Sequence, residues 1–183
     1  MPILGIIASS HVNFIPTGSF SSIATVTVGA GGSSSITFSS IPSTYQHLQL
    51  RISGLGNTNN SGLMRFNSDT GTNYSWHALY GTGATASATN GTSQTFMIGN
   101  GFNLGPSSST TPFVTIIDLF DYSSTSKYKT GRMLDGIDLN GSGSIALMSG
   151  LWMSTAAIST INIAPNTGNY TQYSSFALYG VKG

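Results

Sequence analysis

Several residue types are missing or scarce in this chain, and each absence excludes a class of function. The 183-residue sequence has no cysteine, so neither a disulfide framework nor thiol chemistry is available. Glutamate is also absent, the carboxylates are five aspartates, and charged residues make up only 6% of the chain, where roughly a quarter is usual. The surface must therefore consist largely of Ser, Thr, Asn and Gly. Because so few charges repel copies of the chain from one another, association into an oligomer is favoured.

The scarce basic residues argue against nucleic acid as a partner. The formal net charge is +1, and only Lys127, Lys129 and Arg132 lie near one another. Phosphate binding needs clustered Lys or Arg, so these three are better explained as the solvent face of one strand. The apolar run from Met1 to Ala8 is far shorter than the ~20 residues of a membrane span, so we expect no membrane insertion.

The N-terminal segment MPILGIIA nevertheless needs a partner, because an exposed apolar run should not be left in water. It is either a first strand of the domain or an apolar arm that binds another chain, and both alternatives stay open. Pro16, Thr17 and Gly18 then interrupt the chain. We predict an N-terminal arm at residues 1–18 and one domain at residues 19–183. The docking side chains of the arm would be Ile3, Leu4, Ile6 and Ile7.

Period-two alternation dominates the rest of the sequence. Apolar and polar residues alternate over Ile36 to Phe38 and again over Leu48 to Ile52, on either side of Pro42, which belongs in the connection because it has no N–H to donate. Such segments recur about every ten to fifteen residues with turn residues between them, and no helical periodicity is long enough for a core helix. The pattern predicts an all-β protein, a single antiparallel jelly-roll-like β-sandwich with an N-terminal arm.

Two segments carry more specific predictions. Residues 81–93 are small and polar throughout, which predicts a long flexible loop. The segment FVTIIDLF, Phe113 to Phe120, is the most apolar part of the domain, which predicts a central strand buried on both faces.

One aromatic cluster is a candidate recognition surface. Tyr74, Trp76, His77 and Tyr80 lie in the strand-like segment YSWHALY, and sugar rings stack on flat side chains of this kind. Core packing explains Trp76 and Tyr80 equally well, because strand alternation places them on one face. Glycan binding therefore remains an alternative to simple packing.

The sequence shows no catalytic constellation and implies no cofactor. Asp118 and Asp121 lie at the end of an apolar strand, where alternation turns them to opposite faces rather than into a carboxylate pair. A glycine-rich loop with Asp135, Asp138 and Asn140 offers oxygen ligands for calcium, but it lacks the spacing and the terminal Glu of an EF-hand loop. A plain turn is the better explanation. We therefore expect neither an enzyme nor a metal site.

Five segments of the chain are distinctive in sequence: SIATVTVGAGG at 22–32, SSITFSSIPSTYQHLQLR at 34–51, YKTGRMLDG at 128–136, GLWMSTAAISTINI at 150–163 and QYSSFALYGVKG at 172–183. Their sequences resemble those of a family of small virion structural proteins of tailed bacteriophages. The likeness covers nearly the whole chain, including the MPILGIIASS start, and weakens at residues 55–62 and 81–112.

The resemblance implies a protein of the virion, displayed as a capsid decoration or cement subunit or as part of a tail fibre. Proteins of this kind are commonly trimers, so the expected partners are further copies of the chain and other virion proteins, such as the major capsid or tail proteins. No catalytic residues come with the resemblance. The alternative is a glycan-binding module for attachment to the host surface.

Overall fold

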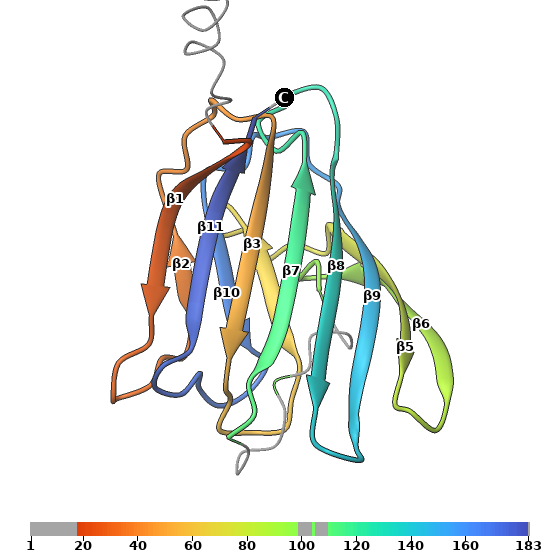
Figure 1. The fold of residues 1–183 in the computed structure, drawn as a ribbon. Coiled ribbons are helices and arrows are strands. Elements are labelled where there is room, and N and C mark those ends of the chain that lie inside the picture. Colours follow the sequence, from red (N-terminus) through yellow and green to blue (C-terminus); the bar gives the residue numbers. More distant parts are fainter. Residues whose placement is uncertain (1–17, 99–103, 105–109, 183) are drawn as a thin grey trace, which may run out of the picture.

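The computed structural model describes residues 18–98, 104 and 110–182. Within these ranges the chain forms two antiparallel sheets (Figure 1). The larger sheet has eight strands, in the spatial order β1 (Phe20–Thr27), β11 (Ser175–Val181), β3 (His47–Gly54), β7 (Phe113–Phe120), β8 (Lys129–Asp138), β9 (Gly143–Trp152), β5 (Tyr74–Gly81) and β6 (Ala86–Gln94). The smaller sheet has three, in the order β2 (Ile36–Phe38), β10 (Ile161–Pro165) and β4 (Gly62–Phe66).

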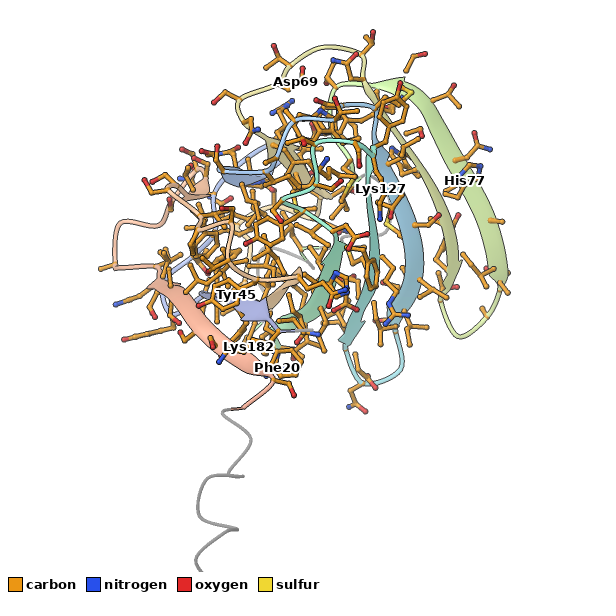
Figure 2. The ribbon with its side chains drawn as sticks, turned by 90° about the horizontal axis from the view of Figure 1, so that it is seen from above. Phe20, Tyr45, Asp69, His77, Lys127 and Lys182 are labelled. Carbon is orange, nitrogen blue, oxygen red and sulfur yellow. The ribbon has the colours of Figure 1, made fainter. Side chains whose placement is uncertain are left out.

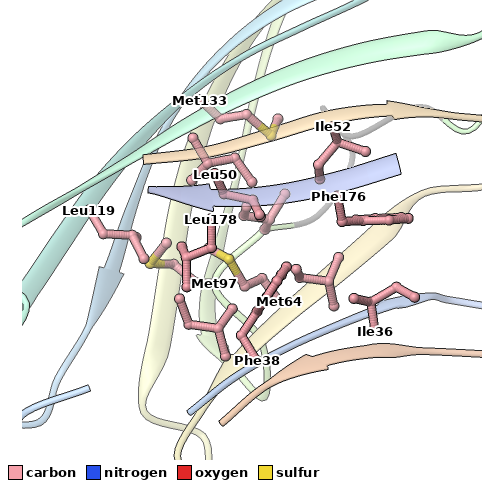
Figure 3. Packing of buried hydrophobic residues seen from close by; sticks show 14 of the residues in the cluster. Ile36, Phe38, Leu50, Ile52, Met64, Met97, Leu119, Met133, Phe176 and Leu178 are labelled. Atoms are coloured by element: carbon pink, nitrogen blue, oxygen red, sulfur yellow. The ribbon is translucent and has the colours of Figure 1, made fainter. Parts of the chain in front are cut away.

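The core lies between the two sheets. Strands β2, β10 and β4 lie behind β1, β11, β3 and β7 in Figure 1, while β5 and β6 lean away at the other end of the larger sheet. Leu50, Leu178 and Phe176 of the larger sheet are fully buried with Met64 of the smaller one, as Figure 3 shows. Among the described residues, the cover is on one face of the larger sheet, and the other face, here called the outer face, is exposed.

The structure confirms the predicted fold class, an all-β antiparallel β-sandwich. Two strands late in the chain insert between early ones: β10 lies between β2 and β4, and β11 lies between β1 and β3. The described parts of the chain contain no helix that could cross a membrane. The predicted docking residues Ile3, Leu4, Ile6 and Ile7 lie outside the described residues.

The prediction of a flexible loop at residues 81–93 is wrong for most of that segment. Residues 86–94 form β6, which pairs with β5 and is the last strand of the larger sheet. An edge strand outside the sandwich core needs backbone partners on one side and few apolar side chains, so small polar residues suffice here. The amino-acid composition reflects side-chain polarity and therefore indicated a loop. Strand β6 is instead held by backbone pairing with β5, which composition does not reveal.

The prediction for Phe113 to Phe120 is half right. The segment is strand β7, near the middle of the larger sheet, and Phe113, Ile117 and Leu119 are buried. Its outer face, however, leaves Val114 55% exposed and Ile116 44% exposed. The strand is apolar on both faces, but the smaller sheet covers only one of them.

Candidate functional site

The outer face of the larger sheet carries a patch of aliphatic side chains, here called the aliphatic band. Each member is between 44% and 60% exposed. Ile116 of β7 pairs directly with Leu134 of β8, Leu134 with Leu147 of β9, and Leu147 with Leu79 of β5. The other two members, Val114 and Ile145, lie two residues along β7 and β9. The band consists of Leu79, Val114, Ile116, Leu134, Ile145 and Leu147.

A depression begins in the aliphatic band and extends over β3 and β11, where Ser53 and Ala177 line it. In the row that contains Val114 and Ile145, the residue between them is Gly136 of β8. The absent side chain opens this end of the hollow, which has a volume of about 450 Å³. A Cβ added to Gly136 would meet only the Ser144 carbonyl oxygen, at 3.7 Å. The band therefore combines projecting aliphatic side chains with an open space beside them.

A polar row borders the aliphatic band on one side. It crosses five neighbouring strand pairs in direct register, through Gln49, Asp118, Arg132, Ser149, His77 and Asn90. The Asp118 carboxylate accepts hydrogen bonds from Gln49 Nε2 at 2.8 Å and from Arg132 Nε at 3.1 Å. The charges next to the band are therefore paired with each other.

Arg51 of β3 lies at the edge of the aliphatic band, directly opposite Ile116 of β7. Its guanidinium carbon lies 5.0 Å from the ring centroid of Phe20 and 4.7 Å from that of Tyr179, which is cation–π distance. Its Nε also donates to Gln49 Oε1 at 2.7 Å. These contacts hold the cation at the border of the band.

The predicted aromatic recognition surface is not formed. Tyr74 is fully buried and Trp76 is 6% exposed, because alternation along β5 turns both toward the core. Burial raises the pKa of Tyr74 to about 12. Tyr80 is half-buried, and His77 alone of the four is exposed, in the polar row outside the packed interior (Figure 2).

The weak calcium alternative is not supported by the geometry either. Asp135 is buried on the inner face of β8 and accepts a hydrogen bond from the Thr115 hydroxyl, whereas Asp138 is exposed on the outer face. The Asp138 side chain accepts the backbone N–H of Asn140 at 2.8 Å, as in an ordinary turn. Among the residues that the structure describes, no group of three His or acidic residues could hold a metal ion.

Lys129 departs from the expected solvent face of its strand. Its side chain is buried, and Nζ donates to the carbonyl oxygens of Lys127 at 2.7 Å and Thr155 at 3.3 Å. Desolvation lowers the pKa of this ammonium group. Arg132 lies on the outer face, three residues along the strand, so the basic residues of this segment form no common patch.

The aliphatic band was missed because its residues resemble those of a core. The segments FVTIIDLF and IALM are apolar at consecutive positions, and period two assigns such residues to faces without showing which face is covered. The sequence holds no direct signal for the band, because the division into an eight-stranded and a three-stranded sheet is seen only in the structure. Comparisons with models of protein families and with curated proteins found no match to this chain.

Proposed function

We propose that the protein is a structural component of a tailed-bacteriophage particle, displayed on its surface as a capsid decoration or cement subunit or as part of a tail fibre. It assembles as a homotrimer through its β-domain, and its N-terminal arm binds a neighbouring virion protein. The observation that carries the proposal is the aliphatic band, a surface suited to binding another protein. The resemblance of the sequence to virion structural proteins supports the phage particle as its location.

Such a protein functions by burying apolar side chains against neighbouring proteins. Fully burying a large aliphatic side chain contributes roughly 1.5–3 kcal/mol, and the side chains of the band are already about half-buried, so each contributes about half of that on docking. A broad sheet behind them keeps the side chains in fixed register, which limits the entropy lost on binding. Several modest contacts, repeated by symmetry in a trimer, then act together.

Electron microscopy of labelled particles tests this proposal. An antibody raised against the purified chain should decorate intact particles at regular positions on the head or the tail, and pre-immune serum should not. Mass spectrometry of the same purified particles should detect the chain. Particles that carry neither label nor peptide, when the chain is abundant in infected cells, would rule out a virion component.

No second function is proposed. The glycan-binding alternative placed its site at Tyr74, Trp76, His77 and Tyr80, with the segments at residues 55–62 and 81–93 around them. Because Tyr74 and Trp76 are buried, neither ring is available to stack on a sugar.

A further inference from the structure

We propose that the aliphatic band is the contact between copies of this chain, with the outer face of one sheet packed on a second copy. The inference rests on the assembly step of the proposed function and names its partner and its residues. It does not depend on where the assembly sits in a particle.

The first argument is size. Neighbouring strands lie ~4.8 Å apart and each residue adds ~3.4 Å, so an eight-stranded sheet with strands of about eight residues presents a face of roughly 1,000 Å². A stable protein interface buries about 800 Å² on each partner. The outer face is therefore large enough for a standard interface, and the band lies over β7, β8, β9 and β5 within it.

The second argument is the distribution of polarity. The aliphatic band carries no charge, and it is bordered by the polar row and by Arg51. An apolar centre with a polar rim is the usual anatomy of an interface between proteins. Arg132 forms an ion pair with Asp118 in the rim, and Arg51 donates to Gln49 and lies over the rings of Phe20 and Tyr179. Docking would therefore bury neither guanidinium group without a partner.

The third argument is shape. The hollow at Gly136 lies beside the projecting side chains of Leu134 and Ile145, so one surface provides both the knobs and the space that receives them. A cyclic trimer is held by heterologous contacts, in which the projecting side chains of one copy meet the hollow of the next, and this surface supplies both parts.

The fourth argument is charge, which permits close contact between identical copies and disfavours a strongly charged partner. The whole chain has a net charge of +1 with 6% charged residues. Two copies therefore repel each other weakly. The band offers no charge that would recognise a strongly acidic or basic partner.

The decisive experiment compares two substitutions on the same strand and the same face. Leu147→Asp places a carboxylate in the band, and Ser149→Asp places the same group two residues along β9, in the polar rim. Analytical ultracentrifugation of the full-length chain should show an oligomer for the wild type and for Ser149→Asp. Leu147→Asp should weaken association by about 100-fold or more, giving a 19.0 kDa species.

Two further measurements guard against a folding defect. Gly136→Leu projects a side chain into the hollow from a position where an added Cβ would meet only the Ser144 carbonyl oxygen, at 3.7 Å. The monomer should therefore keep its circular dichroism spectrum while association weakens. Because the chain has no cysteine, Leu79→Cys also gives a single site for a spin label. Pulsed electron paramagnetic resonance should then show a distance between copies that disappears with Gly136→Leu.

Two outcomes overturn the inference. If the full-length wild type is monomeric at high concentration, no second copy covers the band. The accessibility of the Leu79→Cys label, measured before and after removal of residues 1–8, would then show whether that segment covers the band instead. Folded Leu147→Asp and Gly136→Leu variants that associate as strongly as Ser149→Asp would place the contact elsewhere. Particle labelling is independent of both outcomes, so the location and the interface fail separately.

Discussion

Asp69 is tied to residues from distant parts of the chain. Its carboxylate accepts hydrogen bonds from Trp152 Nε1 at 2.7 Å, Asn73 Nδ2 at 3.0 Å and the backbone N–H of Gly71 at 2.8 Å. The bonds from Trp152 and Asn73 hold the pKa of Asp69 below its ordinary value of 3.8. Trp152 is almost fully buried and stacks on Tyr74, so one carboxylate joins a surface turn to the core.

Trp152→Phe should destabilise the protein by about 1–3 kcal/mol at neutral pH, because it removes the N–H that Asp69 accepts. A lowered folded pKa gives stability that is complete above the unfolded value and is lost as the pH falls through the folded pKa. The difference between wild type and variant should therefore shrink below about pH 3.8. Urea unfolding at pH 7, 4 and 2.5 measures it.

Trp76→Phe is the matched control for this substitution. The Trp76 indole N–H is buried and has no hydrogen-bond partner among the described residues. Its loss should change stability only through packing, by an amount that does not vary with pH between 7 and 2.5. An equal pH dependence in both variants would contradict the role assigned to the bond between Trp152 and Asp69.

For single residues, the sequence indicates roles in local turns but not hydrogen-bond partners far along the chain. The turn chemistry of Asp69 follows from its neighbours in Asn67 to Gly71. Trp152 lies 83 residues away, and nothing in the local pattern around either residue indicates the bond. The burial of Lys129 was missed for the same reason, since its second acceptor, Thr155, lies beyond the end of the next strand.

Strands β8 and β9 meet at a pair of glycines that receives a side chain from another segment. Gly131 and Gly150 are direct partners in the sheet, and the Met97 side chain packs over them, almost fully buried. A Cβ on Gly150 would lie 2.5 Å from Met97 Cγ and 3.0 Å from the Met97 carbonyl oxygen. The two strands therefore depend on glycine at this point to accommodate the residues that follow β6.

Gly150→Ala should destabilise the sandwich by about 1–3 kcal/mol, because the added methyl group overpacks against a backbone atom as well as a side chain. Gly136→Ala on the neighbouring strand is the control, since its Cβ would meet nothing closer than 3.7 Å. Thermal unfolding followed by circular dichroism compares the two. Equal melting temperatures would show that the Met97 segment moves aside without cost.

The strands themselves were largely predictable, but their environments were not. Alternation identified β3 and β5 with the correct inward faces, because these strands mix apolar and polar residues. In β7 the outward Val114 and Ile116 are as apolar as the inward residues, so the pattern suggested burial on both faces. Strand β6 was missed because edge pairing makes no demand on hydrophobicity.

At the scale of the whole molecule, we propose that residues 1–8 attach the protein to the particle. Deleting them should leave a folded domain with an unchanged circular dichroism spectrum that no longer joins particles, because the apolar side chains that bind the neighbouring virion protein are gone. Complementation with the truncated chain, followed by mass spectrometry of purified particles, measures incorporation. Normal incorporation of the truncated chain would disprove the role of this segment.

The order of strands in the larger sheet also constrains when the molecule takes shape. Strand β11, built from residues 175–181, lies between β1 and β3, which come from residues 20–54. Strand β1 lies beyond β11 at the end of the larger sheet, so during synthesis it has no neighbour there until residues 175–181 have left the ribosome. Strand β3 can pair with β7 earlier. A chain stalled before residue 175 would therefore expose the unpaired edge of β3 to the chaperones of the cell.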